Sequence, residues 1–198
     1  MQKIYRTDDR IIREVPQAEA GCWIMLTTPT MDECTEISEK YGIDISDLRA
    51  ALDDEESSRI TLEDDYTLIL VDIPTAEIRN ERNTYTTIPL GILLTEDMLI
   101  TVCSEETTVL TTFVKQRVRN FSTKKQMRFT YQILYNSCML YQSLLRSIDR
   151  KRTDIEMRLN KNTEDADLFD LHEIESNLVY FATSLRANGV VLDRLTRY

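Results

Sequence analysis

Acidic clusters are the residues in this sequence that could bind a cation. Two of them, 53–56 and 63–65, lie on either side of a strand-like run. A third opens the last helical segment and comprises Glu164, Asp165, Asp167 and Asp170. Carboxylate oxygens are the ligands that Mg²⁺ and Ca²⁺ prefer. Acidic residues also stabilise helix starts, and no cluster has the alternation of a calcium loop. We therefore interpret the clusters as structural, with Asp53 and Asp54 as candidate metal ligands.

The sequence contains no comparable set of residues for catalysis. His172 is the only histidine and lies in a polar stretch, so we interpret it as a solvated surface residue. The sequence contains four glycines and no G-x-S-x-G or phosphate-binding glycine loop. Its four cysteines form no C-x-x-C pair, which excludes zinc-site spacing and favours free thiols in a reducing cytoplasm. These patterns predict that the chain is not an enzyme.

The charge balance excludes a further class of partner. Lys and Arg number 24 against 34 Asp and Glu, and the net charge of −10 disfavours binding to nucleic acid or to an anionic membrane surface. The sequence also lacks the roughly 20 consecutive apolar residues that span a bilayer. A basic patch nevertheless precedes the last helical segments: Arg117, Arg119, Lys124, Lys125 and Arg128. We interpret it as a solvated face that pairs with acidic neighbours, or alternatively as a contact with an acidic neighbouring subunit.

Residues 1–122 show the alternation of strands and helices that is typical of an α+β layered domain. Apolar runs predict strands over 3–5, 11–15, 22–28, 59–63, 66–73, 87–95 and 98–103. Turns at 63–65 and 96–97 predict two hairpins. Thr30 and Asp32 are placed to cap a helix that ends at Gly42, and a short helix is expected over 46–52. Pro74 and residues 80–83 indicate an exposed connection between the hairpins.

Residues 123–198 predict two long antiparallel helices. Apolar residues recur at steps of three or four in two series: Met127, Tyr131, Leu134, Cys138, Tyr141, Leu145, Ile148, Ile155 and Leu159, then Leu171, Ile174, Leu178, Phe181, Leu185, Asn188, Leu192 and Leu195. Asn188 stands where an apolar residue is expected, and it either specifies register or faces water. The second series still runs at Leu195, so we expect this helix to continue as a stalk.

Taken in order, these segments resemble the CorA family of divalent-cation (Mg²⁺/Co²⁺) transporters. The similar runs are Trp23-Ile-Met-Leu-Thr-Thr-Pro-Thr, Tyr41-Gly-Ile with Asp47-Leu-Arg-Ala-Ala-Leu-Asp, Arg59-Ile with Asp65-Tyr, Ile73-Pro, Pro89-Leu-Gly-Ile-Leu-Leu-Thr, and Leu178-Val-Tyr-Phe with Leu185 and Asn188. The resemblance implies a cytoplasmic αβα sandwich with a mixed sheet, followed by a long helical hairpin. It also implies a homopentamer whose axial pore has a Gly-Met-Asn mouth, which is absent from these residues and expected in a following membrane segment.

The family's regulatory cation site does not transfer to this chain. Members carry an acidic pair in the short helix after the Tyr-Gly-Ile turn, whereas the matching residues here are Arg49 and Ala50. The site, if retained, would therefore use Asp47 or Asp53. The implied function is gating of the pore by intracellular Mg²⁺ or another divalent cation, at the cytoplasmic face of the cell membrane. A zinc-efflux relative, a self-associating cytoplasmic scaffold and a hydrolase that uses the acidic clusters are the alternatives.

Overall fold

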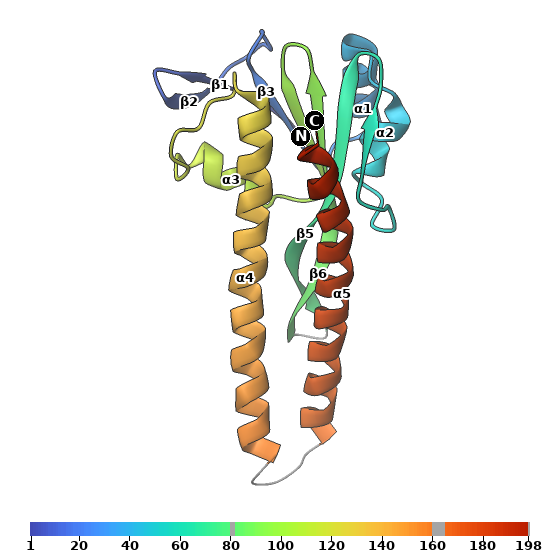
Figure 1. The fold of residues 1–198 in the computed structure, drawn as a ribbon, viewed down its shortest axis with the longest axis vertical. Coiled ribbons are helices and arrows are strands. Elements are labelled where there is room, and N and C mark those ends of the chain that lie inside the picture. The colour runs from blue at the N-terminus through green and yellow to red at the C-terminus, as the bar shows by residue number, and fades with distance from the viewer. Residues whose placement is uncertain (80–81, 160–164, 198) are drawn as a thin grey trace.

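A seven-stranded mixed sheet forms the centre of the computed structural model, which describes residues 1–79, 82–159 and 165–197 (Figure 1). The strands are β1 (Gln2–Asp8), β2 (Ile11–Glu14), β3 (Trp23–Thr27), β4 (Arg59–Leu62), β5 (Tyr66–Arg79), β6 (Arg82–Thr95) and β7 (Leu99–Cys103). Their order across the sheet is β2-β1-β3-β7-β6-β5-β4. Strands β3 and β7 run parallel, and the other described neighbours are antiparallel. The predicted α+β class and both hairpins are confirmed.

Helices cover both faces of this sheet, which confirms the αβα sandwich. On one face α1 (Met31–Tyr41) and α2 (Ile45–Ala50) pack on a core that includes Ile24, Leu68 and Leu70. On the other, α3 (Thr108–Val114) and parts of α4 (Gln126–Leu159) and α5 (Asp165–Leu195) pack on a core that includes Trp23 and Ile69. Adjacent strand residues thus point into different cores, because side chains alternate along a strand.

Local signals set the start and end of α1 as predicted. Thr30 caps the helix by accepting a hydrogen bond from the Glu33 backbone, and the Glu33 side chain accepts one from the Thr30 backbone in return. This reciprocal capping box satisfies two helix-terminal donors. Asp32 lies in the first turn instead of at the cap. Gly42 ends the helix at φ +65°, a left-handed conformation that suits glycine.

Strands β5 and β6 extend beyond the ends that the sequence predicted. They pair without interruption from Tyr66↔Thr95 to Arg79↔Arg82, so the connection expected around Pro74 is wrong. A proline interrupts a sheet only where its missing N–H would face another strand. Pairing with β4 ends at Arg59↔Leu70, so no strand of the described residues borders β5 on that side at Pro74. Residues 80–81, within the predicted connection, lie outside the described residues.

Helices α4 and α5 form the predicted antiparallel hairpin, and they project past the sheet with the β5–β6 extension between them (Figure 1). At about 1.5 Å per residue, each helix is roughly 45–50 Å long. Helix α5 ends at Leu195, and its continuation as a stalk stays a prediction. Among the described residues, no helix has both the length and the apolar character that a membrane crossing requires.

Fewer than half of the residues in each predicted apolar series are buried. Leu134, Tyr141, Ile148 and Ile155 on α4, and Ile174, Phe181 and Leu195 on α5, face the interior as expected. The alternate positions are exposed instead, including Met127, Tyr131, Cys138, Leu178 and Leu185. Their places in the interior are taken by polar residues one position away: Thr130, Ser137, Asn177 and Ser184. The apolar pattern therefore located the helices correctly but misplaced their inner face.

Candidate functional site

The acidic surface around α2 holds the candidate metal ligands. Asp47, in the first turn of α2, accepts a hydrogen bond of 2.7 Å from the Tyr66 hydroxyl. Burial and this bond raise the pKa of Tyr66 to about 12, which keeps the hydroxyl protonated as a donor. The Arg59 guanidinium lies 3.9 Å from the same carboxylate. Asp47 therefore already has a neutral donor and a cation as neighbours.

Asp53 and Asp54 follow α2 in an exposed loop. The Asp53 carboxylate accepts a hydrogen bond of 3.0 Å from the Glu55 backbone, which is a local turn contact. In the part of the chain that the structure describes, no three acidic, histidine or cysteine side chains converge to hold a metal ion. A single copy thus supplies scattered carboxylates, and the assignment of Asp47, Asp53 and Asp54 as ligands stays a prediction.

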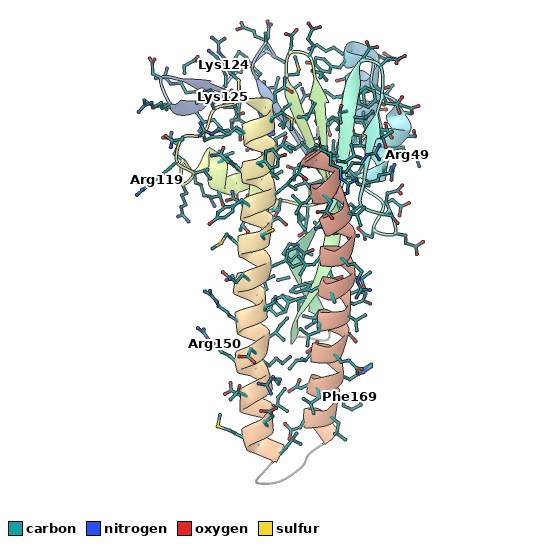
Figure 2. All side chains as sticks on the ribbon, in the orientation of Figure 1. Arg49, Arg119, Lys124, Lys125, Arg150 and Phe169 are labelled. Atoms are coloured by element: carbon teal, nitrogen blue, oxygen red, sulfur yellow. The ribbon has the colours of Figure 1, made fainter. Side chains whose placement is uncertain are left out.

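Arg49 and Ala50 occupy very different environments. Arg49 is exposed on α2 at the outer side of the molecule (Figure 2), whereas Ala50 is 6% exposed and belongs to the core beneath the helix. A carboxylate at position 50 would be desolvated without a partner. An acidic pair at these positions could therefore present only its first member to solvent.

Gly91 fixes how closely α2 approaches the sheet. A Cβ atom on Gly91 would lie 2.7 Å from the Cβ of Ala51, closer than packed carbons approach. Ala51 is the C-terminal cap of α2, and its Cβ is rigidly attached to the backbone, so the helix itself would have to shift. The small residue at this position in β6 thus holds α2 and its acidic surface in place.

We expect Gly91→Ala to lower the free energy of unfolding by about 1–3 kcal/mol through overpacking. The double variant with Ala51→Gly removes the clashing atom and should recover part of that loss, which urea unfolding of the four proteins in the cycle would measure. Additive losses in the double variant would show that the contact does not position α2.

Two residues of the acidic cluster at the start of α5, Asp167 and Asp170, form ion pairs with α4, in agreement with the structural interpretation, whereas Glu164 and the Asp165 side chain lie outside the described part of the chain. Arg158 Nε lies 2.9 Å from Asp167, and Arg158 also lies 3.1 Å from Asp170. Lys151 Nζ lies 2.6 Å from Glu173. Asp167 is 5% exposed, so its charge is largely removed from water and depends on these partners. His172 is exposed on α5, as predicted.

A polar face of α5 attaches the helix to the β5–β6 extension, and sequence analysis missed it. The Asn188 side chain accepts from the Asp72 backbone N–H at 2.9 Å and donates to the Asp72 carbonyl at 2.7 Å. One helical turn away, Ser184 lies 2.9 Å from the Thr87 hydroxyl, and farther along the Asn177 side chain accepts from Thr84 at 2.9 Å. These bonds fix the register of α5 against the strands.

Directional hydrogen bonds therefore join α5 to strands β5 and β6 of the sheet. Hydrogen bonds to backbone groups form only when the helix and the strands are in one register, whereas an apolar interface is compatible with several registers. These bonds fix the position of α5 relative to β5 and β6.

Comparisons with known proteins match this architecture. The family model described as "CorA-like Mg2+ transporter protein" matches residues 18–198. The cobalt/magnesium transport protein CorA of Methanocaldococcus jannaschii is 28% identical over an alignment of 184 residues, which covers 88% of this chain and 55% of that protein.

Solved structures agree with the match. The complete structure of the M. jannaschii CorA magnesium transporter superposes with a TM-score of 0.86 at 23% identity, covering 100% of this chain and 63% of that one. The ZntB cytoplasmic domain of Vibrio parahaemolyticus gives 0.68 at 12% identity, with 98% and 78% covered. Both likenesses show the fold alone, and the chain spans little more than half the length of the relative that it matches in sequence. On the family match, which extends over nearly all of its residues, the chain belongs to the CorA-like Mg²⁺ transporter family.

Proposed function

We propose that this chain is the cytoplasmic regulatory domain of a Mg²⁺/Co²⁺ transporter, which couples intracellular divalent cation to gating of a pore. The observation that carries the proposal is the family match over residues 18–198. The register-locked attachment of α5 to the sheet supports it, because gating requires a rigid link between sensor and pore. The pore belongs to membrane segments that are expected to follow, and the domain would lie at the cytoplasmic face of the membrane.

The physical basis of gating is repulsion between like-charged copies. Each chain carries a net charge of −10, so copies assembled as a homopentamer repel one another. A divalent cation held between acidic faces of adjacent copies offsets this repulsion and favours the closed packing, and loss of the cation allows the copies to separate. The carboxylates of Asp47, Asp53 and Asp54 are the proposed contributors from the α2 surface.

Arg49 weakens any such site. Its exposed guanidinium adds a positive charge to the surface on which the cation would bind. We therefore expect closure to require more Mg²⁺ than in family members with an acidic pair at these positions. Arg49→Glu should then shift closure to lower Mg²⁺ concentration.

Transport by the full-length protein in liposomes tests the proposal. Mg²⁺ or Co²⁺ uptake should occur and should fall as Mg²⁺ on the cytoplasmic side rises into the millimolar range. Asp53→Asn with Asp54→Asn should reduce this inhibition, and the matched change of Asp64→Asn with Asp65→Asn, in the β4–β5 turn, should leave it intact. Calorimetry on the intact assembly that detects no millimolar Mg²⁺ binding would contradict the regulatory role, and export of Zn²⁺ without Mg²⁺ uptake would favour the zinc-efflux alternative.

A further inference from the structure

A groove of about 510 Å³ lies between the start of α4 and the loop that follows α3. We call it the arginine groove; its lining includes Arg117, Arg119, Arg128, Gln132 and Tyr135. Arg119 projects from this side of the molecule in Figure 2, on the opposite side from Arg49 and the acidic α2 surface. The volume of the groove is within the range of small-molecule binding sites.

The three guanidiniums of the groove belong to exposed residues. None of Arg117, Arg119 and Arg128 forms an ion pair with a residue that the structure describes, although acidic residues outnumber basic ones by 34 to 24 in this chain. The arginines are exposed, as expected of a solvated face, but they do not show the expected pairing with a described acidic residue, whereas Lys124 lies 4.0 Å from Asp8 as expected. Exposed guanidiniums that line one groove are donors for an anion, and their planar fork matches phosphate.

A buried acceptor beside the groove has no hydrogen-bond partner among the described residues. The Gln132 amide nitrogen donates to the Arg119 carbonyl at 3.1 Å, and because a carbonyl only accepts, this bond fixes the orientation of the amide. The Gln132 Oε1 atom is then left buried without a hydrogen bond to any group in the described part of the chain. A buried acceptor without a partner is costly and calls for an explanation. This oxygen is closed off from solvent, so an N–H or O–H group of a ligand in the groove would reach it only after a movement of the Gln132 side chain.

Two exposed tyrosines complete the lining. Tyr131 and Tyr135 lie one turn apart on α4 and are 40% and 65% exposed. Phenol rings at the edge of a basic groove provide faces on which a planar heterocycle can stack. Arg117 and Arg119 are carried by the loop that follows α3, and Arg128 lies in the first turn of α4. The loop begins with a helix-ending turn in which Gln116 is left-handed at φ +55° and the Arg117 N–H donates to the Thr112 carbonyl at 3.0 Å.

We propose that the arginine groove binds a mononucleotide. The guanidiniums take the phosphates, Gln132 Oε1 accepts from a hydroxyl or amino group of the nucleoside, and a tyrosine ring stacks on the base. Inorganic phosphate alone would leave the Gln132 acceptor and the rings unused. A nucleic acid strand would extend beyond the groove over a chain of net charge −10, whereas a single nucleotide interacts mainly with the nearby arginines because charges beyond about 8 Å are screened.

Thermal unfolding of the 198-residue chain with ADP in EDTA tests the proposal, since EDTA removes any effect of a metal carried by the nucleotide. At ten times Kd, ADP should raise Tm by about 3–5 °C. Adenosine and inorganic phosphate should each give a smaller shift at equal concentration, because each supplies only part of the contacts. Increasing KCl should weaken ADP binding.

Variants separate the groove from general charge effects. Arg117→Gln with Arg119→Gln should raise Kd for ADP by about tenfold or more. Tyr135→Ala should weaken ADP more than inorganic phosphate. The matched control is Arg150→Gln, an exposed arginine of α4 far from the groove (Figure 2), which should leave Kd unchanged.

Two results would overturn the proposal. One is the absence of an ADP-dependent shift, or an equal shift in the Arg117→Gln, Arg119→Gln variant. The other is self-association, measured by light scattering, that this variant abolishes while ADP has no effect, because an acidic surface of a second copy would then be the occupant of the groove. Neither result depends on transport or Mg²⁺ binding, so both leave the proposed function unaffected.

Discussion

Phe181→Ala is expected to loosen the projecting half of the α4–α5 pair while the sheet domain stays folded. Phe181 is 1% exposed and packs edge-on against Tyr141, with ring centroids 5.1 Å apart. With Ile148, Ile155 and Ile174 these rings form a core cluster distinct from the two that cover the sheet. Truncation of a buried phenylalanine costs about 3–5 kcal/mol, and here that loss falls on the projecting cluster.

Hydrogen exchange and tryptophan fluorescence report the two regions separately. Backbone amides of α4 and α5 near Tyr141 and Phe181 should exchange faster in the variant. Trp23, the only tryptophan, is fully buried in the sheet core, so its urea midpoint should change little. Val179→Ala, at a position 58% exposed on the same helix, is the matched control and should change neither signal. An equal loss of exchange protection and of the urea midpoint would show that the α4–α5 hairpin and the sheet unfold as one unit.

Elements with strong local signals were predictable from the sequence. Glycine, capping residues and acidic turns determine the backbone conformation locally. Helix α1 and the β4–β5 and β6–β7 hairpins therefore form at the positions of these residues. The β5–β6 extension was not predicted because Pro74 was interpreted as marking the end of a strand. Whether a proline breaks a strand depends on what lies beside it, and that neighbour is set by the tertiary fold.

The inner face of α5 could not be read from hydrophobicity. An apolar series assumes that helices pack on each other, but α5 packs largely on the edge of two strands that offers hydrogen-bonding groups. Asn177, Ser184 and Asn188 recur at seven and four residues, which is helical spacing. Polar residues counted with that period would have revealed the face.

The candidate sites were predictable to different degrees. Acidic residues near α2 were identified from their type alone, but their burial and partners required the fold. The basic patch was also evident in the sequence, whereas the groove that Arg117, Arg119 and Arg128 line depends on how the loop after α3 packs on α4. The partnerless oxygen of Gln132 carries no sequence signal, since it arises from a single hydrogen bond to a backbone carbonyl.

Asn188→Leu should lower the free energy of unfolding by about 2–3 kcal/mol, because leucine fills similar space but leaves the Asp72 backbone N–H without an acceptor. The Asp72 carbonyl loses one of two donors and keeps the Tyr141 hydroxyl at 3.1 Å. Ser58, which donates to the Asn188 side chain at 3.0 Å, also loses its partner. Asp72 lies just past the end of β4 pairing, so the Asn188 amide takes the place of a neighbouring strand.

This substitution distinguishes the two interpretations of α5. If residue 188 lay in an apolar seam between helices, leucine would improve the packing and raise stability. If the asparagine pairs with the strand edge, leucine must lower stability, and the Asp72 amide must lose its protection from hydrogen exchange. Thr183→Leu, at an exposed position of the same helix, should alter unfolding by less than about 0.5 kcal/mol and serves as the control. A stabilised Asn188→Leu variant with a protected Asp72 amide would contradict the proposed hydrogen bonding of α5 to the strand. The sign of the change in the free energy of unfolding therefore decides how α5 is attached to the sheet.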